Sequence, residues 1–402
     1  MQPLTGVVKN YAWGSTSAIP ALLHRRDDGR PQAEYWLGAH AAGPATMRGL
    51  GRTDAPQTLD TWLRLYPEAL GEASRARFGD RLPFLLKVLA ADKPLSLQAH
   101  PQAADAAAGF DRENAAGVPL DAPERNFKDP WPKPELLVAL TPFEALSGFR
   151  DPKHTLALFE ALDVRDTVIS PVVGPLRHRD DPQAALAEVF LDTLASGDIR
   201  GEAVTEVVAA CARHLEDPGA LGDFARMAVL LDEHYPGDAS LLAALMLNHV
   251  RLDPGQALHN TPGTLHAYIS GVGVEIMANS DNVLRGGLTP KHIDPSALAA
   301  CVDFEAKDAP VVHPLLEDDG ILSYPTPDPQ FALWRLDTRP GHPVPLPGAG
   351  RPRILLVVEG TADAHDPVDD LTLTQGQACF IGADESPVLT GSALAFLAAS
   401  GV

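Results

Sequence analysis

A block with the periodicity of α-helices lies between two regions that have the pattern of β-strands, and this order constrains the possible fold of the chain most strongly. Within residues 151–247, apolar residues recur at spacings of three and four, the period of an amphipathic helix. The segments that carry this pattern are residues 154–162, 183–194, 202–214 and 220–231. Before and after the block, short apolar runs alternate with Gly and Pro, as expected for strands and turns. We therefore predict a mainly β protein with an α-helical insert.

The chain has 402 residues, more than one hydrophobic core usually supports, so we expect several domains. We predict a first domain from residues 1–150 and 248–294, a helical domain from residues 151–247, and a C-terminal domain from residues 295–402. The C-terminal domain has strand signals at residues 331–336, 353–358, 371–373, 378–381 and 393–397. This spacing is typical of a small β-sandwich or barrel.

The formal net charge of −21 argues against nucleic acid or an anionic membrane as a partner, because binding a polyanion needs a positive surface. An anionic substrate would therefore need a local basic site. Three separated cysteines, Cys211, Cys301 and Cys379, fit neither a disulfide framework nor a thiolate zinc cluster. The N-terminus has no signal-peptide pattern, and no apolar run approaches about 18 residues. We expect a cytoplasmic protein.

Three short pairs of polar residues could together hold a metal ion. Gln98 and His100 are two residues apart in a segment that we predict to be a strand, so both side chains would leave the same face. Alone this signal is weak, because the edge of any strand can carry such a pair. The two further pairs downstream are Lys133 with Glu135 and His266 with Tyr268.

The candidate metal ligands are an amide oxygen, a carboxylate and two imidazoles. Two histidines and a carboxylate are the usual ligands of a catalytic zinc, with positions left for another oxygen donor, water or substrate. With Gln98, His100 and His266 neutral and Glu135 anionic, a Zn²⁺ site would keep a net charge of about +1. That charge would stabilise a developing oxyanion. We predict one zinc ion per chain, bound by Gln98, His100, Glu135 and His266.

Several cationic side chains occur near these pairs in the sequence. Arg285 and Lys291 follow the last pair, and an arginine suits forked recognition of a phosphate or an enediolate. By default, both would be solvated surface charges. Further donors in the segments that carry the candidate ligands are Lys87, Ser96 and Lys133. The combination predicts a phosphorylated polyhydroxy substrate.

Simpler structural interpretations exist for the remaining candidates. Glu275 could be the partner of an ion pair, and Asp281 a turn residue. Trp13 and Tyr268 would ordinarily be aromatic residues of the core or its rim. The histidines without a partner at metal-binding spacing, which we interpret as structural, are His40, His249, His259, His292 and His365.

Taken together, these motifs resemble type I mannose-6-phosphate isomerase, also called phosphomannose isomerase, of the cupin superfamily. The segments that carry the resemblance are residues 10–14, 34–38, 84–89, 95–101, 133–135, 266–268, 280–285 and 287–291. They occur in the family's order, and the combination is highly specific. The C-terminal region resembles the family only in general character.

The resemblance implies a cupin-type β-barrel catalytic domain, an inserted helical domain and a second, C-terminal cupin-like β-barrel. It also implies a zinc-dependent enzyme of carbohydrate metabolism and GDP-mannose biosynthesis that interconverts D-mannose 6-phosphate and D-fructose 6-phosphate. We expect a monomer, but the sequence itself does not give the oligomeric state. The family's metal ligands correspond to Gln98, His100, Glu135 and His266, and its catalytic arginine to Arg285. Its pocket residues correspond to Trp13, Lys87, Ser96, Lys133, Tyr268, Glu275, Asp281 and Lys291.

Such a reaction moves a proton between C2 and C1 of the sugar through a cis-enediol(ate), which needs a base and support for a negative oxygen. We expect Arg285 to stabilise the enediolate. We expect Lys87, Ser96 and Lys133 to bind the phosphate or orient its end of the substrate. The residues leave the identity of the base open between Lys291, Glu275 and Asp281.

One position departs from the family pattern. Many members have a histidine where this chain has Pro132, and a proline cannot transfer a proton. An acid–base role for that histidine is therefore excluded here.

Two other classes of function remain as alternatives. A cupin metal oxygenase would also use histidines and a carboxylate, but it would bind iron and would have little need for several cations. A non-catalytic sugar-phosphate-binding protein could keep the pocket, but would have no reason to keep a metal with an open coordination position.

Overall fold

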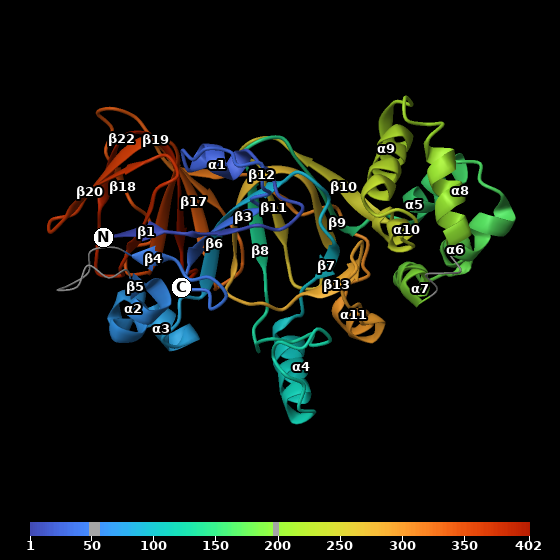
Figure 1. Cartoon of the computed structure of the whole chain (residues 1–402), viewed down its shortest axis with the longest axis horizontal. Coiled ribbons are helices and arrows are strands. Elements are labelled where there is room, and N and C mark those ends of the chain that lie inside the picture. The colour runs from blue at the N-terminus through green and yellow to red at the C-terminus, as the bar shows by residue number, and fades with distance from the viewer. Residues whose placement is uncertain (48–56, 196–200) are drawn as a thin grey trace.

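A computed structural model describes residues 1–47, 57–195 and 201–402, which form two antiparallel sheets of eleven strands each and a separate group of helices (Figure 1). In Figure 1 the sheets occupy the left and centre of the molecule, and most helices lie at the right. The predicted mainly β architecture with helices is confirmed. Neither sheet closes into a barrel within the described residues, so the cupin-type barrels stay a prediction.

The central sheet is organised around the long strand β12 (His266–Ala278). Its second half pairs with β6 (Phe84–Ala91) on one side and β8 (Glu135–Ala139) on the other. Its first half pairs with β9 (Phe143–Phe149) and, at its first residue, with β7 (Leu97–Ala99). The remaining strands are β2 (Val7–Lys9), β3 (Glu34–Gly38), β10 (Leu247–Leu252), β11 (Ala257–Asn260), β13 (Leu284–Gly287) and β14 (Val311–Val312).

The second sheet is built mainly from the C-terminal part of the chain, around the long paired strands β19 (Arg353–His365) and β22 (Val388–Ala399). Strand β1 (Gln2–Thr5) joins it by pairing with β21 (Ala378–Ile381). The first strand of the chain therefore lies in the C-terminal sheet, although we place residues 1–150 in the first domain; the domain bounds stay a prediction. The other strands are β4 (Thr46–Met47), β5 (Gln57–Thr58), β15 (Leu315–Asp318), β16 (Ile321–Tyr324), β17 (Ala332–Thr338), β18 (Val344–Pro345) and β20 (Asp370–Thr374).

The described part of residues 151–247 is helical up to the start of β10. Its helices are α5 (Pro152–Ala161), α6 (Asp166–His178), α7 (Pro182–Ala195), α8 (Gly201–Cys211), α9 (Gly219–His234) and α10 (Ser240–Ala244). The periodicity predicts α5, α7, α8 and α9 to within a few residues. It misses α6 because Pro171 and Pro175 interrupt the apolar pattern of that helix.

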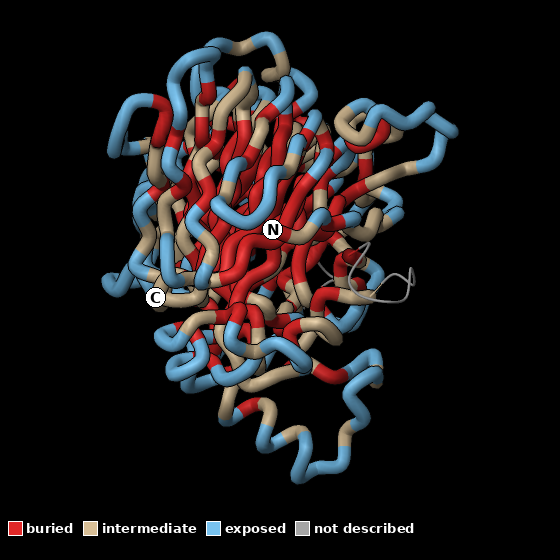
Figure 2. Tube along the Cα trace, turned by 90° about the vertical axis from the view of Figure 1, so that its left-hand side faces the viewer, coloured by how far each residue is buried: buried red, intermediate tan, exposed pale blue. Residues whose placement is uncertain are grey.

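The two sheets pack against each other through a shared apolar core, which Figure 2 shows as buried chain running through the molecule. Leu86 and Val88 of β6 belong to this core together with Ile354 of β19. Side chains alternate between the two faces of a strand, so Lys87 lies on the opposite face of β6. That opposite face of the central sheet carries the candidate site.

The helical region contacts the central sheet directly at β13. Gly287 has a φ of +134°, and a Cβ atom there would lie 2.1 Å from the Cβ of Ser240. Only glycine allows this close approach. The hydroxyl of Ser240 accepts a hydrogen bond of 2.7 Å from the backbone N–H of Leu288. The contact fixes α10 beside the strand that carries Arg285.

The remaining helices lie outside the 151–247 block. Helix α4 (Ala103–Ala115) projects away from the sheets (Figure 1). None of the described helices has the length and apolar character to cross a membrane. Cys211, Cys301 and Cys379 are buried and free, as expected from their spacing. The other helices are α1 (Ala18–Leu22), α2 (Leu59–Leu65), α3 (Glu72–Phe78), α11 (Pro295–Cys301) and the 3₁₀ helix η1 (Pro67–Leu70).

Candidate metal centre

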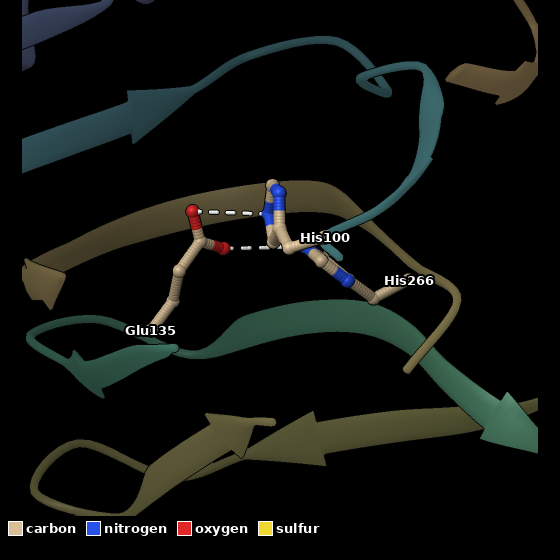
Figure 3. Close-up of side chains that lie close together, drawn as sticks. All are labelled: His100, Glu135 and His266. Atoms are coloured by element: carbon tan, nitrogen blue, oxygen red, sulfur yellow. Dashed lines mark ion pairs between the residues drawn. The ribbon is translucent and has the colours of Figure 1, made fainter. Parts of the chain in front are cut away.

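His100, Glu135 and His266 meet inside the central sheet, as Figure 3 shows. Glu135 is the first residue of β8, and His266 is the first residue of β12. His100 lies one residue beyond the end of β7, so the predicted strand stops just short of it. All three side chains are buried, and one potential ligand atom from each lies within 4.8 Å of the others. The structure thus brings together three of the four predicted ligands at one point.

The carboxylate of Glu135 faces both imidazoles. Its Oε1 lies 3.2 Å from Nε2 of His100, and its Oε2 lies 3.2 Å from Nε2 of His266. Although they are buried, His100 Nε2 and Glu135 Oε2 form no hydrogen bond within the described residues. Buried polar atoms without a partner are costly. The nitrogen and oxygen donors therefore fit a divalent cation such as zinc, which would satisfy them.

Backbone carbonyls fix the orientation of both histidines. Nδ1 of His100 lies 2.7 Å from the carbonyl oxygen of Asn282, and Nδ1 of His266 lies 2.9 Å from that of Thr264. A carbonyl only accepts hydrogen bonds, so Nδ1 carries the proton in each ring and Nε2 presents a lone pair. Burial lowers the pKa of His100 to about 4, which keeps its imidazole neutral and able to bind a metal.

Gln98 is the fourth predicted ligand, and its side chain reaches the same centre. It lies opposite His266 in the pairing of β7 with β12, and its Nε2 is 3.3 Å from His266 Nε2. The oxygen and nitrogen of an amide exchange places by a half-turn. Such a turn would direct the oxygen of Gln98 to the position facing His266.

Lys133 forms an ion pair with the carboxylate of Glu135. Its Nζ lies 3.0 Å from Glu135 Oε1, and the side chain is buried. Burial by itself raises the pKa of Glu135, but the nearby Lys133 and His100 hold it well below its usual range. Glu135 is therefore a carboxylate, and its charge compensates that of Lys133.

A second buried network lies further along β12. Lys87 and Glu275 are opposite each other in the pairing of β6 with β12, and Lys87 Nζ is 2.9 Å from Glu275 Oε2. Glu34 adds a second carboxylate 3.6 Å from Lys87 Nζ. The hydroxyl of Tyr268 donates a 2.9 Å hydrogen bond to Glu275 Oε1. Burial raises the pKa of both Glu275 and Tyr268. Both oxygens of Glu275 are thus engaged, as its structural interpretation predicts.

Three cationic side chains that form no ion pair with any described residue lie near one another. Arg285 of β13 donates a 2.9 Å hydrogen bond from Nη1 to Ser96 Oγ, and partial burial lowers its pKa. The pKa of Lys291 is lowered chiefly by Arg285, then by partial burial and by Lys128. Lys128 has no partner at a recognisable spacing in the sequence, so no sequence pattern indicates it.

Asp281 is held by two neighbours. The Nδ1 of His40 accepts a hydrogen bond from the N–H of Ala42, so its Nε2 carries the proton and faces Asp281 Oδ1 at 3.3 Å. Burial raises the pKa of Asp281, but the hydrogen bond to His40 and the charges of His40, Lys133 and Lys128 together lower it. The Asp281 side chain remains 48% exposed. The backbone N–H of Asp281 donates to Asp129 Oδ2 at 2.7 Å. His40 therefore positions Asp281, a role that its sequence context does not predict.

Aromatic side chains lie on another side of the same region. Trp13 stacks on Tyr11 with 5.8 Å between the ring centroids. Tyr11 is exposed, and its pKa is raised by partial burial and then by Glu34 and Asp281. Lys87 and Arg285 act against this rise, so Tyr11 lies near both the buried network and the cations. Tyr11 belongs to the segment 10–14 that carries the family resemblance, but no pattern in the sequence indicates its role.

Comparisons with known proteins identify the family to which this chain is similar. The family described as "Phosphomannose isomerase type I, catalytic domain" matches residues 1–152. Mannose-6-phosphate isomerase of Escherichia coli (strain K12) is 38% identical over 390 residues, which covers 96% of this chain and 96% of the relative. The Homo sapiens protein of the same name is 31% identical over 411 residues, which covers 96% of this chain and 94% of the relative.

Solved structures of phosphomannose isomerases are also similar to this chain. A crystal structure of a mutant phosphomannose isomerase from Salmonella typhimurium matches with a TM-score of 0.89 at 35% identity, covering 100% of both chains. A zinc-bound crystal structure of mannose 6-phosphate isomerase matches with a TM-score of 0.88 at 36% identity, covering 100% of this chain and 99% of the other. The chain belongs to the type I mannose-6-phosphate isomerase family.

Proposed function

We propose that this chain is a zinc-dependent aldose–ketose isomerase that interconverts D-mannose 6-phosphate and D-fructose 6-phosphate. The observation that carries the proposal is the buried cluster of His100, Glu135 and His266, in which two polar atoms have no hydrogen-bond partner among the described residues. Relatives of nearly the same length bear the name mannose-6-phosphate isomerase, and one structural match is described as zinc-bound. No specific observation favours the oxygenase or the non-catalytic alternative.

Zinc would be held by His100, Glu135 and His266, with the amide oxygen of Gln98 as the fourth protein ligand. When bound, zinc supplies a Lewis acid that polarises sugar oxygens. We place these ligands in a cupin-type arrangement, by analogy with the family. The small phosphorylated sugar is the substrate, and the monomeric state and cytoplasmic location remain predictions.

The ion pairs change our assignment of the phosphate end of the substrate. Lys87 and Lys133 already have carboxylate partners at 2.9 and 3.0 Å, so binding a phosphate would mean breaking a buried pair. Lys128 and Lys291 have no such partner among the described residues, and they lie close enough for Lys128 to lower the pKa of Lys291. We therefore assign the phosphate to Lys128 and Lys291, and the buried lysines to holding Glu275 and Glu135.

Arg285 suits the enediolate rather than the phosphate. It lies opposite Gln98 in the pairing of β13 with β7, which places it beside the candidate metal ligands. Its hydrogen bond to Ser96 leaves four of its five N–H donors for the substrate. A fixed cation next to the reacting carbons stabilises the negative oxygen of the enediolate.

For the general base, the structure favours Asp281 among the three open candidates. Both oxygens of Glu275 are occupied by Lys87 and Tyr268, and its side chain is buried. Lys291 lies among cations that suit the phosphate. Asp281 is ionised and partly exposed, and His40 holds only its Oδ1. A base must be within reach of the proton that it removes, and Asp281 alone combines access with a free carboxylate oxygen.

The first test is a coupled assay of the purified protein with mannose 6-phosphate. We expect fructose 6-phosphate to form, the rate to fall to background after exhaustive chelation, and zinc to restore it. The identity of the product should be checked separately by NMR. A zinc-loaded protein that leaves mannose 6-phosphate unchanged would contradict the proposed function.

The second test measures zinc content and does not depend on activity. We expect His266→Ala to weaken zinc binding about a hundredfold or more, because it removes a direct ligand and leaves Glu135 without one of its partners. Zinc should be measured by mass spectrometry after dialysis against a competing chelator. The control is His365→Ala, which removes an exposed histidine paired with Asp370 and should keep full zinc. Equal zinc in both variants would place the metal elsewhere.

The third test concerns the phosphate. We expect Lys128→Gln and Lys291→Gln each to raise KM for mannose 6-phosphate by about 10-fold or more, because each removes a charge-assisted contact. The KM for unphosphorylated mannose should stay unchanged in the same variants. Lys153→Gln, on the exposed side of α5, is the matched control and should behave like the parent protein. A rise in KM of the same size for both sugars would rule out a phosphate contact.

The fourth test separates the candidate bases. We expect Asp281→Asn to lower kcat by about 100-fold or more while zinc content and KM change little, since general base catalysis typically contributes 10²–10⁴-fold. His40→Ala should lower kcat less, because it only releases one oxygen of Asp281. Asp319→Asn, a surface change in the turn between β15 and β16, serves as the control. If kcat of Asp281→Asn stays within twofold of the parent, the base is a different group.

A further inference from the structure

A cavity of about 330 Å³ lies where the central sheet meets the helical region, away from the candidate metal centre. Strands β9 and β10 form one side, and helices α5, α9 and α10 form the other (Figure 1). Its inner wall is apolar and buried, and includes Leu146, Leu158, Phe224 and Met227. Small-molecule sites are commonly apolar hollows of a few hundred Å³, at the boundary between structural units, with a few polar groups that fix orientation.

Arg150 provides a cation at this cavity without a compensating charge. Its Nη1 and Nη2 donate to the carbonyl oxygens of Leu245 and Leu247 at 3.2 and 2.7 Å. It forms no ion pair with any residue in the described ranges. Burial lowers the pKa of Arg150 to about 10. A guanidinium has five N–H donors, so three remain for a ligand. A partly buried cation without a counter-ion favours an anion beside it.

The other charges around the cavity are already balanced. Asp223 accepts from Arg226 at 2.6 Å and from Arg251 at 2.8 Å. Arg251 also contacts Glu144 at 3.1 Å. His249 is different, because its buried Nε2 is 3.8 Å from the nearest Glu144 oxygen and forms no hydrogen bond with the described residues. The cavity thus has one uncompensated positive charge and one unsatisfied imidazole nitrogen.

We propose that this cavity is a second ligand site, which binds a small organic monocarboxylate with an apolar body. The carboxylate accepts hydrogen bonds from the free donors of Arg150, in the forked geometry that a guanidinium offers. The apolar body packs against Leu158, Phe224 and Met227. One uncompensated cation matches one negative charge, which favours a carboxylate over a doubly charged phosphate ester.

The cavity shares no lining residue with the candidate metal centre, although its strands are connected to β12 through the sheet. His249 of β10 pairs with Leu146 of β9, and Leu146 pairs with Ala267 of β12, the neighbour of His266. Binding in the cavity should therefore not need the metal ligands. Binding in the cavity can therefore be measured separately from binding of the sugar phosphate.

The test uses the full-length, zinc-loaded protein and isothermal titration calorimetry with 3-phenylpropionate as the probe. We expect one saturable site per chain, with binding unchanged when mannose 6-phosphate is present in excess. The neutral analogue 3-phenylpropionamide, which has the same size and apolar body, should bind at least tenfold more weakly. Binding should also survive in His266→Ala.

Two variants test the cavity by different routes. Arg150→Met removes the charge and should weaken binding of 3-phenylpropionate at least tenfold, and Met227→Trp should do the same by filling the cavity. The matched control is Arg213→Met. Arg213 likewise donates only to carbonyl oxygens, those of Ala209 and Leu162, but does not line the cavity. Circular dichroism should show that each variant is folded.

Three outcomes would overturn the proposal. The first is no saturable binding up to 10 mM probe. The second is binding that mannose 6-phosphate displaces or that His266→Ala abolishes. The third is equal affinity in the parent protein and in a folded Met227→Trp or Arg150→Met variant. None of these outcomes bears on whether the protein is an isomerase.

Discussion

The burial of the Glu135 carboxylate is the physical constraint on which the rest of the site depends. A carboxylate that is only 2% exposed is unfavourable unless charges or hydrogen-bond donors compensate it. Here the Lys133 ammonium lies 3.0 Å from one of its oxygens, and the Nε2 atoms of His100 and His266 lie 3.2 Å from the two oxygens, where a bound cation would compensate the carboxylate. Glu135 is the first residue of β8, and Lys133 lies just before that strand. His100 follows the end of β7, and His266 is the first residue of β12. The central sheet must therefore be correctly paired before Glu135 can be buried.

Strand β12 connects the metal cluster with a second group of buried charges in the same sheet. It begins with His266, continues through Tyr268, and carries Glu275 opposite Lys87 of β6. The hydroxyl of Tyr268 donates to Glu275, so the metal cluster and the Lys87 ion pair are fixed on one strand. The charges also suit this arrangement, because each buried lysine is beside a buried carboxylate. The free cations lie toward the exposed side, where an anionic substrate can reach them.

The sequence predicts the parts of this structure that depend on local patterns. Gln98 and His100 are two residues apart, and the family motifs add Glu135 and His266, so the cluster could be predicted without knowing the pairing of the strands. The partners of the lysines could not be predicted in this way. Glu275 is 188 residues from Lys87, and only the pairing of β6 with β12 brings them together. For this reason the sequence predicts that Lys87 binds the phosphate or orients its end of the substrate, whereas in the structure Lys87 pairs with a carboxylate.

Similar long-range effects explain two other differences, at β1 and His40, and a local effect explains a third, at α6. Strand β1 pairs with β21 near the other end of the chain, and no local pattern in residues 2–5 indicates this. His40 has no histidine or carboxylate nearby in sequence at metal-binding spacing, yet it lies 3.3 Å from Asp281. The apolar periodicity does not indicate helix α6, because two prolines interrupt it. Tertiary packing nevertheless buries the apolar face of this helix.

Pro132 lies in a backbone segment that is held without a hydrogen bond from an N–H at this position. The backbone around it is held by accepting hydrogen bonds: Trp131 O accepts from Asn282 Nδ2 at 2.9 Å, and Pro134 O accepts from the N–H of Ala278 at 3.1 Å. A proline lacks an N–H but keeps such acceptors intact. The segment therefore still positions Lys133 and Glu135, while proton transfer must come from elsewhere. Asp281 directly precedes Asn282, the residue that holds both Trp131 and the His100 ring, so the same contacts that preserve the scaffold also position the proposed base.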